Sequence, residues 1–154
     1  MREIKAPNKI KSDNLLFLAG SIEMGKAENW QERAMRLLED SNWIILNPRR
    51  DDWDSSWTQS ITNPQFCEQV EWELDAQEKA EKILMYFDVT TKSPISLLEL
   101  GLFAQSGKMI VVCPSGFWRK GNVDIVCRKY GIMELDTLEE AIDYLKNVDK
   151  ILNA

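Results

Sequence analysis

The clearest structural pattern in the chain lies in ILMYFDVTTKSPISLLELGLFAQSGKMIVVCP, residues 83–114. It begins with the apolar run Ile83 to Phe87 and ends with a second run, Met109 to Cys113. Between them, Ser93-Pro94 is typical of a helix start and Gly107 of a helix end. Apolar runs that are continuous rather than alternating are typical of parallel strands covered by helices on both faces. The stretch therefore predicts a strand, a helix and a second, parallel strand.

The same alternation extends in both directions along the chain. We expect strands at 15–19 and 43–46, helices at 29–40 and 64–80, a long polar loop at 48–63, a short helix near 123–130 and an amphipathic helix after Thr137. This pattern predicts a single α/β domain over residues 1–154: a three-layer, doubly wound parallel sheet of about five strands, flavodoxin- or Rossmann-like, in the order 2-1-3-4-5. The polar residues 1–13 are expected to form a flexible N-terminal arm.

The composition excludes several classes of function. The chain has no histidine, which removes Ser-His-Asp and Cys-His nucleophiles and His-ligated zinc. Its net charge is −6, and residues 51–100 hold three Lys and Arg against eleven Asp and Glu, which argues against binding polymeric nucleic acid. Three cysteines without CxxC spacing favour neither disulfides nor a thiolate metal site. With no apolar signal core and no apolar run of ~20 residues, we expect a cytoplasmic protein without metal or cofactor.

In a doubly wound sheet, ligands bind at the carboxyl ends of the strands. Those ends hold residues 19–21, 47–53, 88–93 and 114–119. Neither a GxGxxG fingerprint nor a GxxxxGK[ST] phosphate loop is present, so a nicotinamide dehydrogenase or a nucleoside triphosphatase has little support.

Glu99 lies among apolar residues that surround the helix 93–107 almost completely, which predicts a buried helix. An unpaired buried charge costs several kcal/mol. Glu99 is therefore either half of a structural ion pair or a nucleophile or base at the mouth of the sheet. The second interpretation is favoured because the helix begins at the carboxyl end of a strand.

Glu73 is selected by a helical wheel of residues 65–80 at about 100° per residue. With Phe66 at zero, Val70 lies at about 40° and Glu73 at about −20°, inside the expected core stripe, whereas Asp75 lies near 180°. Glu73 either pairs beneath the long loop or takes part in chemistry. Two inward carboxylates without histidine favour glycosidic chemistry, although their spacing alone also fits a Mg²⁺ site.

The segments FLAGSI (17–22), NPRRDDW (47–53), VEWELDAQEKAEKILMYFD (70–88) and SPISLLELGLFAQSGKMIVVCP (93–114) together resemble the nucleoside 2-deoxyribosyltransferase-like superfamily. This superfamily includes 2′-deoxynucleoside 5′-phosphate N-hydrolases. The resemblance covers roughly residues 15–130. It implies a small parallel doubly wound sheet and N-glycosidic bond cleavage or transfer on 2′-deoxynucleosides or their 5′-monophosphates.

The resemblance also implies roles for the two glutamates. The glutamate of E-L-G-x-x-A, Glu99, would be the nucleophile that forms a covalent deoxyribosyl ester. Glu73 would handle the proton of the departing base. A second base or water would then resolve the ester.

Two positions depart from the family pattern. Ser93 stands where many nucleoside transferases have an aspartate that binds the sugar 5′-hydroxyl, and nucleotide hydrolases resemble this chain in using serine there to hold a 5′-phosphate. Leu16 stands where a tyrosine orients the nucleophile. A non-catalytic nucleotide-binding or sensing module is therefore the alternative function.

The remaining candidates surround these residues. Backbone N–H groups at Gly20 and Ser21 are expected to approach the ligand, with a plain turn as the alternative. Asp88 ends a strand at the site. Polar and aromatic residues after the second strand are expected to bind the base by its edge and face, namely Asn47, Arg49, Asp51, Asp52 and Trp53. The expected countercharges for a phosphate are Lys92, Arg49, Arg50 and Arg119. By the resemblance, we expect a homo-oligomer.

Overall fold

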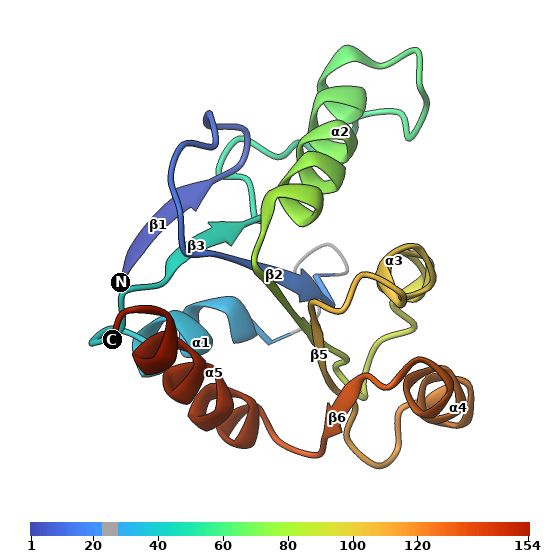
Figure 1. Cartoon of the computed structure of the whole chain (residues 1–154). Coiled ribbons are helices and arrows are strands. Elements are labelled where there is room, and N and C mark those ends of the chain that lie inside the picture. Colours follow the sequence, from blue (N-terminus) through green and yellow to red (C-terminus); the bar gives the residue numbers. More distant parts are fainter. Residues whose placement is uncertain (23–27) are drawn as a thin grey trace.

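The computed structural model describes residues 1–22 and 28–154. Helices and strands alternate through most of the chain (Figure 1). The strands are β1 (Arg2–Lys5), β2 (Leu15–Gly20), β3 (Ile44–Asn47), β4 (Lys82–Tyr86), β5 (Met109–Val112) and β6 (Met133–Leu135). The helices are α1 (Trp30–Leu37), α2 (Pro64–Lys79), α3 (Pro94–Phe103), α4 (Lys120–Tyr130) and α5 (Leu138–Leu152).

The six strands form one parallel sheet in the order β1-β3-β2-β4-β5-β6. Without β1, this is the predicted order 2-1-3-4-5, so the doubly wound prediction is confirmed. In the register, Gly20 at the end of β2 is opposite Tyr86 at the end of β4. The carboxyl ends of the central strands β2 and β4 therefore lie side by side.

The prediction of a flexible arm over residues 1–13 is wrong for its first part. Arg2–Lys5 pair with Ile44–Asn47 as the edge strand β1. Backbone groups flanking the strand add hydrogen bonds, from Arg2 N to Trp43 O at 3.2 Å and from Ala6 N to Asn47 O at 3.0 Å. Because an edge strand is held by its backbone and is partly exposed, its side chains can be polar and leave no apolar signal in the sequence.

Two apolar cores lie on the two faces of the sheet. One contains Phe17 from β2 together with Trp72 of α2, Leu100 of α3 and Val123 of α4. The other contains Leu16 of β2 together with residues of α1 and α5. Successive residues of a strand point to opposite faces, so helices α2, α3 and α4 form one outer layer, and α1 and α5 form the other.

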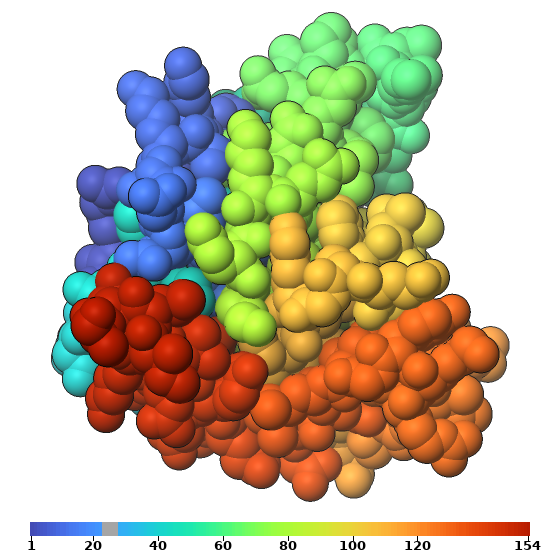
Figure 2. Space-filling model, viewed as in Figure 1, coloured from blue at the N-terminus to red at the C-terminus, as the bar shows by residue number. Residues whose placement is uncertain are grey.

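The prediction that the helix at 93–107 is buried all round is wrong. Ile95, Leu98 and Leu102 of α3 are 57–60% exposed, whereas Leu100 is buried. In the space-filling view, α3 lies at the surface between α2 and α4 (Figure 2). One side of α3 packs on the sheet, and its opposite side forms an exposed apolar stripe.

Candidate active site

Glu99 and Glu73 project from neighbouring helices of the same layer. Glu99 of α3 is only 7% exposed, so its predicted burial is confirmed. Its carboxylate accepts a hydrogen bond at Oε2 from Nε2 of Gln77 on α2, at 2.5 Å. Glu73 lies one turn before Gln77 on α2 and is partly buried. The fold thus brings together the two carboxyl groups that the sequence singled out.

Both carboxyl groups hold their protons more tightly than ordinary glutamates. Burial, reinforced by the charge of Glu99, raises the pKa of Glu73 to about 8. Burial raises the pKa of Glu99 to about 7, against the hydrogen bond from Gln77, which lowers it. Neither carboxyl group belongs to an ion pair within residues 1–22 and 28–154. Glu73 therefore favours its protonated form more strongly than Glu99 does, because the charge of Glu99 adds to the effect of burial.

The core face of α2 is rotated from the predicted one. Val70, expected near the centre of the stripe, is 37% exposed, and the buried residues of the helix are Gln69, Trp72, Ala76 and Gln77. Glu73, at about −20° on the wheel, still lies between the buried residues Gln69 and Gln77. Asp75 is exposed, as predicted. A wheel centred on a phenylalanine misses this rotation because α2 buries two glutamines in place of apolar residues.

Three buried hydroxyl groups lie where β2 ends and α3 begins. The Oγ atoms of Ser21 and Ser93 are 2.5 Å apart. Oγ1 of Thr91 lies 2.8 Å from Oγ of Ser93 and donates to Oγ of Ser21 at 3.0 Å. We call Ser21, Thr91 and Ser93 the hydroxyl cluster. All three residues are at most 4% exposed.

Ser93 does not cap α3 in the usual way. It precedes the helix with a left-handed backbone, φ 49° and ψ 53°, and its side chain makes no capping hydrogen bond. A capping serine has an extended backbone and accepts from the first-turn N–H groups. The fold instead directs the Ser93 hydroxyl toward Ser21 and Thr91, beside the positive end of the helix dipole.

Gly20 and Asp88 flank this cluster and have structural partners. Gly20 has φ 137°, and a Cβ atom there would lie 2.2 Å from the carbonyl oxygen of Tyr86, so glycine is required by the approach of β2 to β4. Asp88 accepts hydrogen bonds from the N–H and hydroxyl of Thr90 and from the N–H of Glu28. Although burial acts in the opposite direction, these hydrogen bonds lower the pKa of Asp88.

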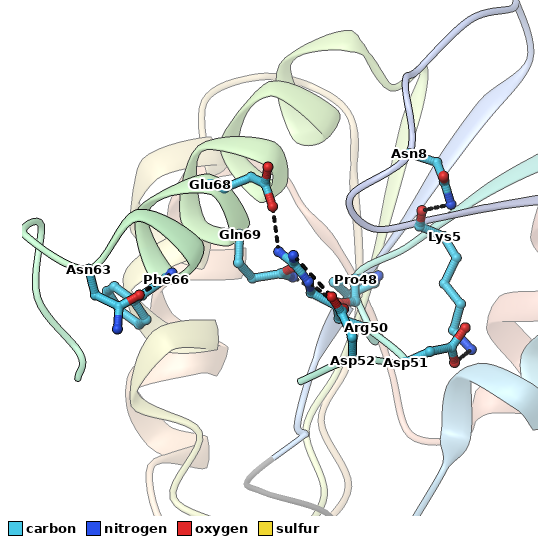
Figure 3. Close-up of polar contacts among 10 residues, drawn as sticks. All are labelled: Lys5, Asn8, Pro48, Arg50, Asp51, Asp52, Asn63, Phe66, Glu68 and Gln69. Atoms are coloured by element: carbon cyan, nitrogen blue, oxygen red, sulfur yellow. Dashed lines mark hydrogen bonds and ion pairs between the residues drawn. The ribbon is translucent and has the colours of Figure 1, made fainter. Parts of the chain in front are cut away.

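The charged residues after β3 pair with one another and with neighbouring elements (Figure 3). The guanidinium group of Arg50 lies 2.6 Å from Asp52 and 2.8 Å from Glu68 of α2, and its side chain is 6% exposed. Asp51 pairs with Lys5 of β1 at 2.6 Å. These contacts tie the loop to α2 and β1, so neither Arg50 nor the two aspartates are brought to Glu99.

Asn47, Arg49 and Trp53 differ in where they are held. Nδ2 of Asn47 donates to Glu3 on the edge strand at 2.7 Å, away from the two glutamates. Trp53 is 36% exposed and packs edge-on against Trp57. Arg49 donates to Gln31 at 2.9 Å and to the carbonyl of Glu28 at 3.3 Å.

Arg49 is linked to the hydroxyl cluster by a chain of hydrogen bonds. Its partner Glu28 donates its N–H to Asp88, whose own N–H donates to Ser21 of the hydroxyl cluster at 2.9 Å. Arg49 forms no ion pair among the described residues. Arg49 therefore remains a candidate, whereas Arg50 is neutralised by two carboxylates.

The ring of Trp118 contacts the other two candidate cations. Lys92 Nζ lies 4.3 Å and Arg119 Cζ 4.7 Å from its ring centroid. The indole N–H donates to the carbonyl of Lys92 at 2.8 Å. This contact joins the loop after β5 to the segment that leads into α3, and it places two positive charges near the start of that helix.

Gln77 and Thr91 are not among the site residues predicted from the sequence. Gln77 lay at about 20° on the wheel, inside the core stripe, and a buried glutamine is unusual enough to have served as a signal. Thr91 gave no signal, because its contact with Ser21 spans 70 residues. Leu16, at the position of the family tyrosine, points into the core beneath α1 and α5, on the face opposite to Glu99.

Two surface hollows lie elsewhere. One of about 520 Å³ follows α2 and is lined in part by Ile61, Glu71 and Asp75. Another of about 300 Å³ lies between α3 and α4, beside Leu97 and Val126. Neither hollow is lined by Glu73 or Glu99. The candidate active site is therefore defined by these two carboxyl groups. Within the described part of the chain, no three Cys, Asp or Glu side chains are arranged to hold a metal ion.

Comparison with known proteins places the chain in a family. A family model described as nucleoside 2-deoxyribosyltransferase like matches residues 13–117, which is more than half of the 154 residues. The match includes the hydroxyl cluster, Glu73 and Glu99. No curated protein matches the chain at a significant level. None of the helices described here is long and apolar enough to span a membrane.

Proposed function

Because the chain belongs to the nucleoside 2-deoxyribosyltransferase-like family, we propose that it cleaves the N-glycosidic bond of 2′-deoxynucleosides or their 5′-monophosphates. Glu99 is the nucleophile and Glu73 the proton donor. The observation that carries this proposal is the pair itself: two carboxyl groups from adjacent helices that form no ion pair among the described residues, and whose pKa values are raised to about 8 for Glu73 and about 7 for Glu99. Glu73, which has the higher pKa, suits the role of proton donor, and Glu99, which has the lower pKa, suits the role of nucleophile.

In the first step, a carboxylate oxygen of Glu99 forms a bond to C1′ of the sugar. The bond between C1′ and the base nitrogen breaks, and its electron pair leaves with the base. Glu73 gives its proton to the departing base, which therefore leaves as a neutral molecule. The products are the free base, a deoxyribosyl ester of Glu99 and an ionised Glu73.

In the second step, the Glu73 carboxylate takes a proton from the attacking group. If that group is water, its oxygen bonds to C1′, Glu99 is released as a carboxylate, and the outcome is hydrolysis. If it is a second base, its nitrogen bonds to C1′, and the outcome is base exchange. In both cases the two glutamates return to their starting protonation states.

The two raised pKa values predict the pH dependence of this reaction. The first step needs Glu99 ionised and Glu73 protonated. Activity is expected to rise with pH through about 7 as Glu99 ionises and to fall through about 8 as Glu73 loses its proton. A narrow bell-shaped profile of kcat/KM is the expected result.

The decisive experiment incubates the protein with each deoxynucleoside and each 5′-monophosphate, with and without a free acceptor base. We expect base release or exchange, which Glu99→Gln abolishes because an amide packs like the carboxylate but does not attack. Intact-mass measurement on the wild type is expected to show a deoxyribosyl adduct. Near-wild-type activity in Glu99→Gln refutes the mechanism. Tight binding of deoxynucleotides without any base release would identify a nucleotide-binding or sensing module instead.

We further propose that the substrate carries a 5′-phosphate. The support is the hydroxyl cluster: the Ser93 side chain makes no capping hydrogen bond to α3, and its hydroxyl lies with two others at the positive end of the helix dipole, where a dianion is favoured. Monophosphates are expected to have a higher kcat/KM than nucleosides, and Ser93→Asp should reduce or reverse that preference because like charges repel. A wild-type preference for nucleosides contradicts this assignment.

We also propose that the chain forms a homo-oligomer through α3. The exposed stripe of Ile95, Leu98 and Leu102 lies on the same helix as Glu99. A twofold axis allows such a stripe to cover its own copy. Light scattering is expected to show a mass above that of a 17.8 kDa chain, which Leu98→Asp lowers. A monomeric wild type at micromolar concentration refutes the interface.

A further inference from the structure

Gln77 is an internal polar residue that apolar packing does not explain. It lies on α2 and is 0% exposed. Its Nε2 donates to Oε2 of Glu99 at 2.5 Å and to the backbone carbonyl of Glu73 at 3.1 Å. Its Oε1 is buried without a hydrogen-bond partner among the described residues. A buried amide that leaves one polar atom unsatisfied destabilises the folded chain, so another requirement must keep glutamine at this position.

The contact with Glu99 supplies that requirement. A carboxylate on a buried helix face needs at least one donor, and a lysine or arginine there would form an ion pair and lower its pKa strongly. An amide donates without adding a charge. Glu99 is therefore held in place while its pKa remains near 7.

The contact also distinguishes the two carboxylate oxygens of Glu99, because Gln77 binds one of them. Gln77 binds Oε2, and its second donor contact, with the carbonyl of Glu73 one turn earlier on α2, fixes the orientation of the amide. The amide cannot turn over without placing Oε1 against the ionised carboxylate. The other oxygen, Oε1 of Glu99, has no hydrogen bond in the described part of the structure.

We propose that Gln77 is the positioning residue of the Glu99 nucleophile: it holds Oε2, so that Oε1 is the oxygen presented to the sugar. This inference rests on the proposed function of Glu99. Gln77 does not touch the reacting atoms, and its effect passes through Glu99. It acts from α2, whereas the family's orienting tyrosine would stand at Leu16, whose side chain lies on the opposite face of the sheet.

The test compares Gln77→Leu with Gln69→Leu in the full chain. Gln69 is a matched control: it lies two turns earlier on α2, is buried, donates to the carbonyl of Pro48 at 2.8 Å, and also leaves its Oε1 unsatisfied. It does not touch Glu99. Both variants remove one buried amide from the same helix, so a general packing effect would appear in both. Gln77→Leu removes two hydrogen bonds, to Glu99 and to the carbonyl of Glu73, whereas Gln69→Leu removes one.

We expect Gln77→Leu to lower kcat by about 10- to 100-fold with little change in KM, because a hydrogen bond to a charged group is lost while no substrate contact is removed. The same loss should move the acid limb of the pH profile upward by about one unit. Among the described residues, the charged group that couples to Glu99 is Glu73 of α2, which is unchanged in both variants. Gln77→Glu should be at least as impaired, because a carboxylate replaces the donor.

A second measurement is independent of turnover. The titration of the Glu99 carboxyl carbon, followed by ¹³C NMR and assigned with Glu99→Gln, should shift upward in Gln77→Leu and stay in place in Gln69→Leu. An active wild type whose kcat and acid limb are unchanged by Gln77→Leu overturns the proposal. An unmoved NMR titration overturns it as well. A wild type that releases no base, but whose Glu99 titration responds to Gln77→Leu, contradicts the proposed function while supporting the Gln77 contact.

Discussion

The charge state of Glu73 makes the stability of the protein depend on pH in an unusual direction. Most carboxylates in folded proteins lose a proton as easily as in the unfolded chain or more easily. Glu73 does the opposite, since burial and the charge of Glu99 raise its pKa from 4.5 to about 8. We predict that Glu73→Gln, which keeps the shape and removes the charge, stabilises the protein at alkaline pH and has much less effect at pH 5.

The sign and size follow from proton linkage. A carboxyl group whose pKa is raised on folding keeps its proton in the folded chain after the unfolded chain has lost it, so its favourable contribution is complete below about pH 4.5 and is lost as the pH rises through about 8. Each pKa unit corresponds to about 1.4 kcal/mol. The difference between pH 5 and pH 8 is then on the order of 3 kcal/mol. For a chain of this size that is a change in Tm of roughly 5–10 °C.

The assay is urea unfolding of wild type and Glu73→Gln at half-unit steps from pH 5 to pH 8.5, with thermal melts in parallel. The free energy of unfolding of the variant should exceed that of the wild type by an amount that grows with pH. Glu71→Gln is the matched control, because it removes an exposed carboxylate from the same helix. A pH-independent difference for Glu73→Gln would refute the argument that a buried, coupled carboxyl group lies at this position.

Three further predictions test other parts of the structure. Glu73→Gln should slow natural substrates by about 10²–10⁴ and slow substrates with good leaving groups much less, whereas Asp75→Asn should be mild; equal losses on both substrate types would indicate a packing role for Glu73. A chelator such as EDTA should leave base release unchanged, and loss of activity restored by Mg²⁺ would assign the carboxylates to a metal. Gly20→Ala should destabilise the fold by several kcal/mol in denaturant unfolding, because its Cβ would lie 2.2 Å from the carbonyl oxygen of Tyr86, whereas Gly121→Ala, with open space around it on α4, should be neutral or stabilising.

Much of the architecture could be predicted from local patterns in the sequence. The continuous apolar runs that become β2, β4 and β5 each lie within a few residues of the predicted positions, because a strand buried on both faces must be apolar at every residue. The burial of Glu99 and the exposure of Asp75 also follow from periodicity along a helix. These features depend on residues that are close together in the chain.

Features that depend on contacts between distant residues could not be predicted from the sequence. The strand Arg2–Lys5 is polar and is recognisable only through its pairing with β3. The loop after β3 looked like a binding surface because it is rich in charge and tryptophan, yet Arg50 is neutralised by Asp52 beside it and by Glu68 from α2. A charged residue in a sequence gives no indication of its partner when that partner lies on another element.

The layered fold and the two glutamates that carry the proposed chemistry could be predicted from the sequence, since amphipathic spacing shows which face of each element is buried. Which residues each buried face contacts depends on how the elements pack against one another. Gln77 and Glu99 are 22 residues apart and become partners because the crossover from α2 through β4 lays α3 beside α2. Ser21 and Ser93 are 72 residues apart and meet because β2 and β4 are neighbours in the sheet. The order of the strands, which no local pattern records, brings Glu99, Gln77 and the hydroxyl cluster to the same part of the molecule.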